Sequence, residues 1–171
     1  MRRLLPAREI AIWIACFLLV STLLVVTRFT SDDPDSALYA ALSARLADGP
    51  VSHWIAPEWW GHWEMEGLFR EHPAGVFAVP TVLGALGVPG VQAANIVGIA
   101  AGLAALLIIG SLVARATSRE EGRLALVLLQ LMPMASIFRI RANHEYPMLV
   151  CLLVALAGFD AVRRSWRWVW L

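Results

Sequence analysis

Long apolar runs constrain this sequence more than any other feature. Three of them, Ile10 to Thr27, Val91 to Ala114 and Tyr146 to Val162, come close to or exceed the roughly 20 residues that a helix needs to cross a bilayer. Leu124 to Phe138 is a shorter fourth run with Pro133 in its middle, where we expect a kink in the helix. Charged residues make up only 16% of the chain, against about 25% in a soluble domain. The sequence therefore predicts an all-α, polytopic bundle of about four membrane spans.

The distribution of arginine predicts how this bundle is oriented. The segment Ala74 to Val88 is apolar but short, and it contains Pro80. If it does not cross, the cytoplasmic segments carry nine arginines and four acids, and the outer segments carry five arginines and nine acids. Cytoplasmic loops are the ones rich in basic residues. We therefore predict a single domain over 1–171 in the cytoplasmic (inner) membrane, with a cytoplasmic N-terminus, an outer loop over 31–73 and a juxtamembrane or partly inserted helix over 74–88.

The outer loop over 31–73 is the longest polar segment of the chain. Within it, Asp35 to Asp48 has the pattern of a helix, because Leu38, Leu42 and Leu46 recur every four residues. Gly49 and Pro50 end the pattern. We expect a short helix that lies on the membrane surface.

Several side chains of the outer segments suit a functional site. Asp33 and Asp35 can bind a divalent cation or act as a base, although capping of the 35–48 helix explains the same pair. Arg139 and Arg141 can hold a phosphate, and contact with lipid headgroups is the alternative. Glu145 begins a span, where an ionisable group is a functional candidate and solvation at a helix end is the competing interpretation.

The histidines and tryptophans of the outer loop allow two interpretations each. His53, His62, His72 and Glu71 have the side chains that bind zinc, but their spacing matches no compact zinc motif, and solvated loop histidines explain them as well. The loop tryptophans, among them Trp60, can stack on a sugar ring or a lipid. Anchoring at the water–lipid boundary is the commoner role of such residues.

Three patterns follow one another in a distinctive order. Residues 34–40 read Pro-Asp-Ser-Ala-Leu-Tyr-Ala, residues 71–74 read Glu-His-Pro-Ala, and residues 141–145 read Arg-Ala-Asn-His-Glu. This order resembles the N-terminal part of GT-C glycosyltransferases of the family 39/83 type, which include protein O-mannosyltransferases and the bacterial aminoarabinose transferase that modifies lipid A. The family patterns are Pro-Asp-Glu-x-x-Tyr-Ala, Glu-Lys-Pro-Pro and an Arg-x-x-x-x-Asp type. Ser36, His72, Ala74 and Glu145 depart from them.

The resemblance implies an enzyme that transfers a sugar from a polyprenyl-phosphate donor to a lipid or protein acceptor on the outer face. It implies Asp35 as the base that activates the acceptor and His72 in the place of the family's lysine. Glu71 is implied as a ligand of a divalent cation of unassigned identity or as a group that positions the acceptor. Glu145 is implied as a ligand of the same cation or as a group that binds the donor. The expected substrate contacts are Asp33, Tyr39, Trp60, Arg139 and Arg141.

The resemblance covers the first third or so of such an enzyme, so we expect this chain to be part of a longer one. A second hypothesis belongs to a different class: a non-catalytic four-span protein that binds a lipid or a protein partner through its outer loop. Neither hypothesis predicts a nucleic-acid partner.

Overall fold

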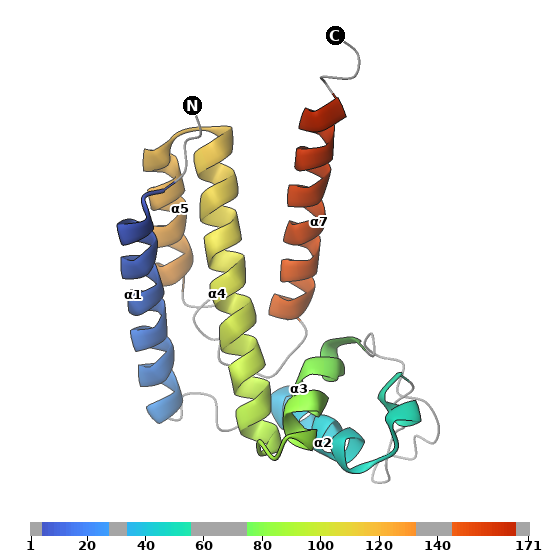
Figure 1. Ribbon diagram of the computed structural model, residues 1–171. Helices are drawn as coiled ribbons and strands as arrows, with labels where there is room; N and C mark the ends of the chain where they lie inside the picture. Colours follow the sequence, from blue (N-terminus) through green and yellow to red (C-terminus); the bar gives the residue numbers. More distant parts are fainter. Residues whose placement is uncertain (1–4, 28–33, 56–74, 133–144, 167–171) are drawn as a thin grey trace.

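The computed structural model describes residues 5–27, 34–55, 75–132 and 145–166. Within these ranges the ordered elements are all helices, and no strand occurs there (Figure 1). Three helices are long and apolar enough to cross a membrane: α1 (Ala7–Val26), α4 (Gly90–Ala116) and α7 (Glu145–Trp166). The described chain is therefore all-helical, as predicted, and it contains three candidate membrane spans.

Helix α4 lies at the centre of the bundle. α1 and α5 (Arg119–Leu131) lie on one side of it and α7 on the other (Figure 1). α1 and α5 run opposite to α4 and α7, so the N-terminus and the ends of α4 and α7 meet at one end of the bundle. We call this end the arginine end, because several arginines lie there. The arginines whose side chains the structure describes at this end are Arg8, Arg115, Arg119, Arg123 and Arg163.

An ion pair fixes two helices at the arginine end. Arg123 of α5 donates from Nε to Oε2 of Glu9 at 2.8 Å and from Nη2 to Oε1 at 2.6 Å. Such paired hydrogen bonds between guanidinium and carboxylate hold both groups in one plane. The bond to Glu9 raises the pKa of Arg123 above its ordinary value, so this side chain stays charged. The N-terminal turns of α1 and α5 are thereby tied to each other.

Three short helices form a layer at the opposite end of α4, which we call the end layer. They are α2 (Pro34–Asp48), η1 (Val51–Ile55) and α3 (Gly75–Ala85) (Figure 1). The predicted helix over 35–48 is confirmed. Its leucines do not have the predicted surroundings, because Leu42 and Leu46 are buried against Phe77 of α3 and Ala94 of α4. Its leucines thus pack on protein, and the expected contact with a membrane surface is not needed to explain them.

Helix α3 is too short to cross a bilayer as a helix. Its eleven residues rise about 16 Å, roughly half the thickness of a hydrocarbon core. It ends in a Schellman motif at Gly87, whose φ of 90° suits glycine. The N–H of Gly87 donates to Gly84 at 2.8 Å and that of Val88 to Leu83 at 3.0 Å. The turn leads directly into α4, which keeps α3 beside the start of that helix.

Helix α5 differs from the predicted span over 124–138. It begins earlier, at Arg119, because Ser118 caps it: the Ser118 hydroxyl accepts from the backbone N–H of Glu121 at 3.2 Å. It ends at Leu131, and Met132 has an extended conformation with ψ of 119°. The residue before a proline avoids the helical region, so Pro133 ends α5 where we had expected only a kink. Residues 133–144 lie outside the described chain.

Candidate functional site: a pocket between the spans and the end layer

The structure describes three of the predicted site residues. Tyr39 and Glu145 are described with their side chains and Asp35 by its backbone alone. The other predicted site residues lie outside the described chain; they are Asp33, Trp60, Glu71, His72, Arg139 and Arg141. The role of Asp35 as the base and that of His72 in the place of the family's lysine therefore stay predictions.

Tyr39 belongs to the core of the end layer. Its side chain is 6% exposed, and its ring stacks on Phe77 with the ring centroids 5.3 Å apart. Aromatic pairs in offset contact at this distance stabilise the packing of the elements that carry them. The described role of Tyr39 is to join α2 to α3, and a contact with substrate stays a prediction.

Trp54 of η1 also has a structural role in the end layer. Its indole N–H donates to the carbonyl of Leu46 at 2.7 Å, and its ring packs against the core cluster around Leu42. The last carbonyls of a helix have no partner within the helix. Trp54 therefore satisfies one of these groups at the end of α2 and holds η1 against it.

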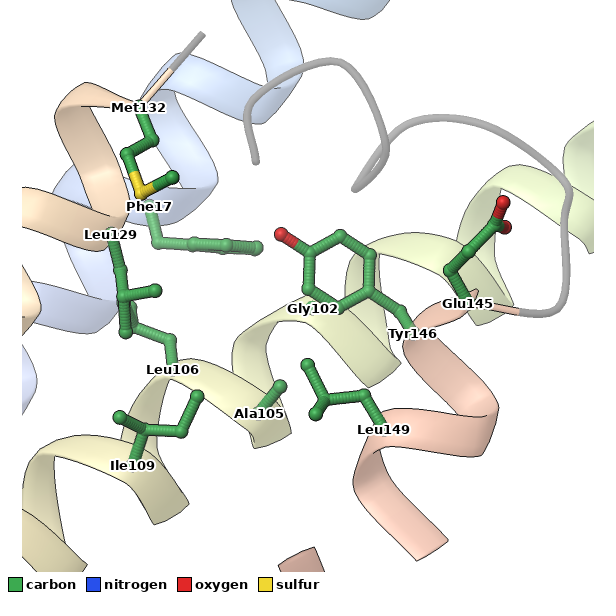
Figure 2. A pocket seen from close by; sticks show the side chains of 10 residues that line it. All are labelled: Phe17, Gly102, Ala105, Leu106, Ile109, Leu129, Met132, Glu145, Tyr146 and Leu149. Atoms are coloured by element: carbon green, nitrogen blue, oxygen red, sulfur yellow. The ribbon is translucent and has the colours of Figure 1, made fainter. Parts of the chain in front are cut away.

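An apolar pocket of about 240 Å³ lies between α1, α4, α5 and α7 (Figure 2). Gly102 and Ala105 of α4 leave room there because their side chains are absent or small. Phe17 closes the pocket from α1 and Leu149 from α7. The remaining lining residues are Leu106, Ile109, Leu129, Met132, Glu145 and Tyr146. The pocket is thus built from residues of four different helices.

Two residues give this pocket its polar character. The ring of Tyr146 enters the pocket, with its hydroxyl directed toward Phe17, whereas the Glu145 carboxylate points away from the cavity (Figure 2). Glu145 is exposed and is the first residue of α7. The pocket therefore has an apolar interior, one phenolic hydroxyl inside and a carboxylate on its rim.

Helix geometry places the pocket within the apolar part of the bundle. Glu145 and Arg163 are eighteen positions apart on the apolar stretch of α7, which is about 27 Å along the axis. This is close to the full thickness of a hydrocarbon core, about 30 Å. If Arg163 lies at one boundary of the membrane, Glu145 lies near the other. The pocket, whose lining includes Glu145, then reaches the boundary that is away from the arginine end.

The end of α5 supports this placement of the pocket. Non-helical backbone at membrane depth occurs where it is buried in protein or lines a cavity. Met132 has left the helix and lines the pocket. Two residues earlier, the Gln130 side-chain amide donates to the carbonyl of Trp13 at 3.4 Å. The residue at which α5 ends therefore also forms part of the pocket wall.

The end layer lies next to the pocket along α4. Ala94 packs in the end-layer core and Gly102 lines the pocket, a difference of eight positions and about 12 Å of helix rise. Within the described residues, no three His, Cys, Asp or Glu side chains gather as metal ligands do. A metal held by Glu71 and Glu145 stays a prediction, since Glu71 lies outside the described residues.

Sequence reasoning identified Glu145 at this site but missed Phe17, Gly102 and Tyr146. Each of them looks like an ordinary residue of an apolar span, and only the packing of four helices shows that they meet. The tyrosine directly after Glu145, at the start of a span, was the available signal. Comparisons with protein-family models, with curated proteins and with solved structures find no match to this chain.

Proposed function

We propose that this chain is a membrane glycosyltransferase, or the N-terminal part of one, that acts on a polyprenyl-phosphate-linked sugar. The sugar is transferred to a lipid or protein acceptor on the outer face of the membrane. One observation carries the proposal. Helix α2, which bears Asp35, lies at the start of α4, and the first turn of α7, which bears Glu145, faces that end from beside the middle of α4 (Figure 1). Glu145 also lines the apolar pocket.

The order of the elements supports this proposal. The order that the sequence resemblance implies is a span, a helical layer, two further spans and then an acidic residue in the second outer loop. The described order is α1, then α2 and α3, then α4, α5 and α7. A lipid-linked donor also explains why polar candidates lie beside an apolar pocket: the chain of the donor stays in the apolar region while its phosphate and sugar reach the boundary.

In the proposed reaction Asp35 is the base. It accepts the proton of an acceptor hydroxyl while that oxygen attacks the anomeric carbon of the donor sugar. The bond from this carbon to the donor phosphate breaks, and the polyprenyl phosphate leaves with the electron pair. Asp35 lies in the first turn of α2, where the partial positive charge of the helix N-terminus favours the carboxylate form.

The test replaces Asp35 by asparagine and follows sugar transfer in membranes that contain the chain. Radiolabelled polyprenyl-phosphate mannose is the donor, and transfer is measured as label that moves to protein or lipid acceptors. Asparagine has nearly the size and the helix propensity of aspartate, so Asp35→Asn in the first turn of α2 removes the base and keeps the fold. We expect transfer to fall by about 10²-fold or more.

The matched control is Asp48→Asn, at the other end of the same helix, where the side chain is exposed. It should transfer sugar at the wild-type rate. Equal rates for Asp35→Asn and Asp48→Asn, with wild-type transfer above that of membranes lacking the chain, would exclude Asp35 as the base. No transfer by the wild-type chain within the full-length protein to which it belongs would contradict the proposal itself.

A second candidate function is lipid binding without transfer. The apolar lining of the pocket favours it, because such a pocket suits a hydrocarbon chain whether or not chemistry follows. This candidate predicts that the chain captures a photoreactive lipid and moves no sugar. It also predicts that Asp35→Asn and Asp48→Asn capture the lipid equally well.

A further inference from the structure

The acids of the arginine end have partners within the bundle. Arg123 pairs with Glu9 at 2.6 Å, and its Nη1 lies 3.9 Å from Glu120. On α7, Arg163 pairs with Asp160 at 3.5 Å. The charges of these two arginines are therefore already balanced by neighbouring carboxylates.

Three further arginines of this end are not balanced in this way. The remaining described acid, Glu121, accepts from the Ser118 hydroxyl at 3.0 Å. Arg8, Arg115 and Arg119, which we call the open arginines, are exposed. Within the described part of the chain, none of the three forms an ion pair. Three positive charges are thus left for a group from outside the bundle.

Packing gathers the open arginines around the turn between α4 and α5 (Figure 1). Arg115 is in the last turn of α4 and Arg119 is the first residue of α5. Arg119 stands four positions before Arg123, so both lie on one face of α5. Arg123 holds Glu9, the neighbour of Arg8 on α1. The core cluster that joins these three helices includes Leu5, Ala114 and Leu126.

Where the three candidate spans cross a bilayer, the open arginines lie at one of its boundaries. Arg8 is in the first turn of α1 and Arg115 in the last turn of α4, and the apolar stretch of α7 ends at Arg163. Long basic side chains near the end of a span extend to the interface, where lipid headgroups lie. The groups available to the open arginines at this level are lipid phosphates.

We propose that the open arginines bind the headgroup of an anionic phospholipid at the membrane boundary of the arginine end. A guanidinium group holds a phosphate by two parallel hydrogen bonds, and both partners stay charged. This lipid site lies at the opposite end of the bundle from Asp35 and Glu145. It does not rest on the proposed transferase, and it binds lipid whether or not the chain transfers sugar.

The charge of the headgroup decides which lipid is preferred. A zwitterionic headgroup such as that of phosphatidylcholine brings its own positive charge close to three guanidinium groups, which repel it. The headgroup of phosphatidylglycerol carries the phosphate without such a charge. The open arginines should therefore select phosphatidylglycerol over phosphatidylcholine.

The test measures this selection in detergent. The protein is incubated in mixed micelles with equal amounts of phosphatidylglycerol and phosphatidylcholine and isolated by gel filtration, and the retained lipids are extracted and quantified. Wild type should retain more phosphatidylglycerol. Arg8→Gln, Arg115→Gln and Arg119→Gln should each lower the ratio of the two retained lipids by about fivefold. Glutamine has nearly the helix propensity of arginine, so each variant should elute as wild type does.

The matched control is Arg163→Gln, which removes the same charge from the same end but from an arginine that is paired with Asp160. It should keep the wild-type ratio. An equal fall for Arg163→Gln and for the three open-arginine variants would mean that net charge alone attracts the lipid, and this would overturn the site. Equal retention of the two lipids by wild type would overturn it as well.

A last comparison separates a lipid headgroup from a free phosphate. The incubation is repeated in inorganic phosphate and in chloride at equal ionic strength, so that screening is the same in both. The lipid ratio should be the same in the two buffers. Loss of the preference in inorganic phosphate alone would assign the open arginines to a free phosphate and overturn the lipid assignment.

Discussion

At the scale of a single residue, the buried hydroxyl of Thr81 lowers the stability of the end layer. Its side chain is fully buried in α3, and among the described residues its hydroxyl has no hydrogen-bond partner. A buried polar group without a partner costs about 1–3 kcal/mol. Valine has nearly the same shape and no hydroxyl. We therefore expect Thr81→Val to raise the thermal stability of the detergent-solubilised protein, by about 1 kcal/mol in unfolding free energy.

The control for this substitution is Thr22→Val on α1, where the side chain is exposed and no buried group changes. Its melting temperature should stay at the wild-type value. A lower melting temperature for Thr81→Val would mean that the hydroxyl has a partner after all, and that it contributes to the packing of α3.

At the scale of elements, the contact between α4 and α5 depends on glycine. A Cβ atom added at Gly122 would lie 2.6 Å from the Cβ of Ala114 and 2.9 Å from the carbonyl oxygen of Gly110. Neither atom can move without shifting α4. Overpacking of this kind costs about 1–3 kcal/mol. We expect Gly122→Ala to lower the stability of the protein by this amount, measured by thermal unfolding in detergent.

Gly158→Ala is the matched comparison, because it adds the same methyl group to a helix where nothing lies within 4 Å. Alanine is the better helix former by about 1 kcal/mol, so this variant should be as stable as wild type or more so. If both glycine variants unfolded at the wild-type temperature, the close approach of α4 to α5 would be wrong.

The sequence predicts the elements of this fold better than their contacts. The spans α1, α4 and α7 follow from hydropathy, and α2 follows from the spacing of Leu42 and Leu46. The start of α5 was missed because charged residues open it and the cap at Ser118 was not considered. Its end was missed because Pro133 was expected to kink a helix that in fact stops before it.

The candidate site is harder to predict for a physical reason. Tyr39 stands three and seven positions before Leu42 and Leu46, so helical periodicity already places it on the buried face of α2. The pocket has no such signal. It exists because α5 ends early and because Gly102 and Ala105 face that end, and both conditions depend on how separate helices pack.

At the scale of the whole molecule, the two ends of the bundle differ in chemistry. The arginine end holds the ion pair between Glu9 and Arg123. The other end holds the end layer and the rim of the pocket at Glu145. Helix α4 has 27 residues and rises about 40 Å, more than the roughly 30 Å of a hydrocarbon core. If the last turn of α4 lies at the membrane boundary on the side of the arginine end, its first turns extend beyond the other boundary, where α2 and α3 pack against them.

This orientation is the central claim, because a donor site on the outer face requires the end layer to lie outside and the arginine end inside. Single cysteines test it in a background where Cys16 and Cys151, both exposed on the spans, are replaced by alanine. Ser52→Cys reports on η1 and Ala116→Cys on the end of α4; both positions are exposed. Ala116 is used in place of the nearby Ser118, because the Ser118 hydroxyl caps α5 and a substitution there would remove the cap.

The measurement is labelling with a membrane-impermeant maleimide in intact and in permeabilised cells. Ser52→Cys should be labelled in intact cells and Ala116→Cys only after permeabilisation. Labelling of both positions in intact cells, or of Ala116→Cys alone, would contradict the orientation and with it the proposed donor site formed by Asp35, Glu145 and the pocket.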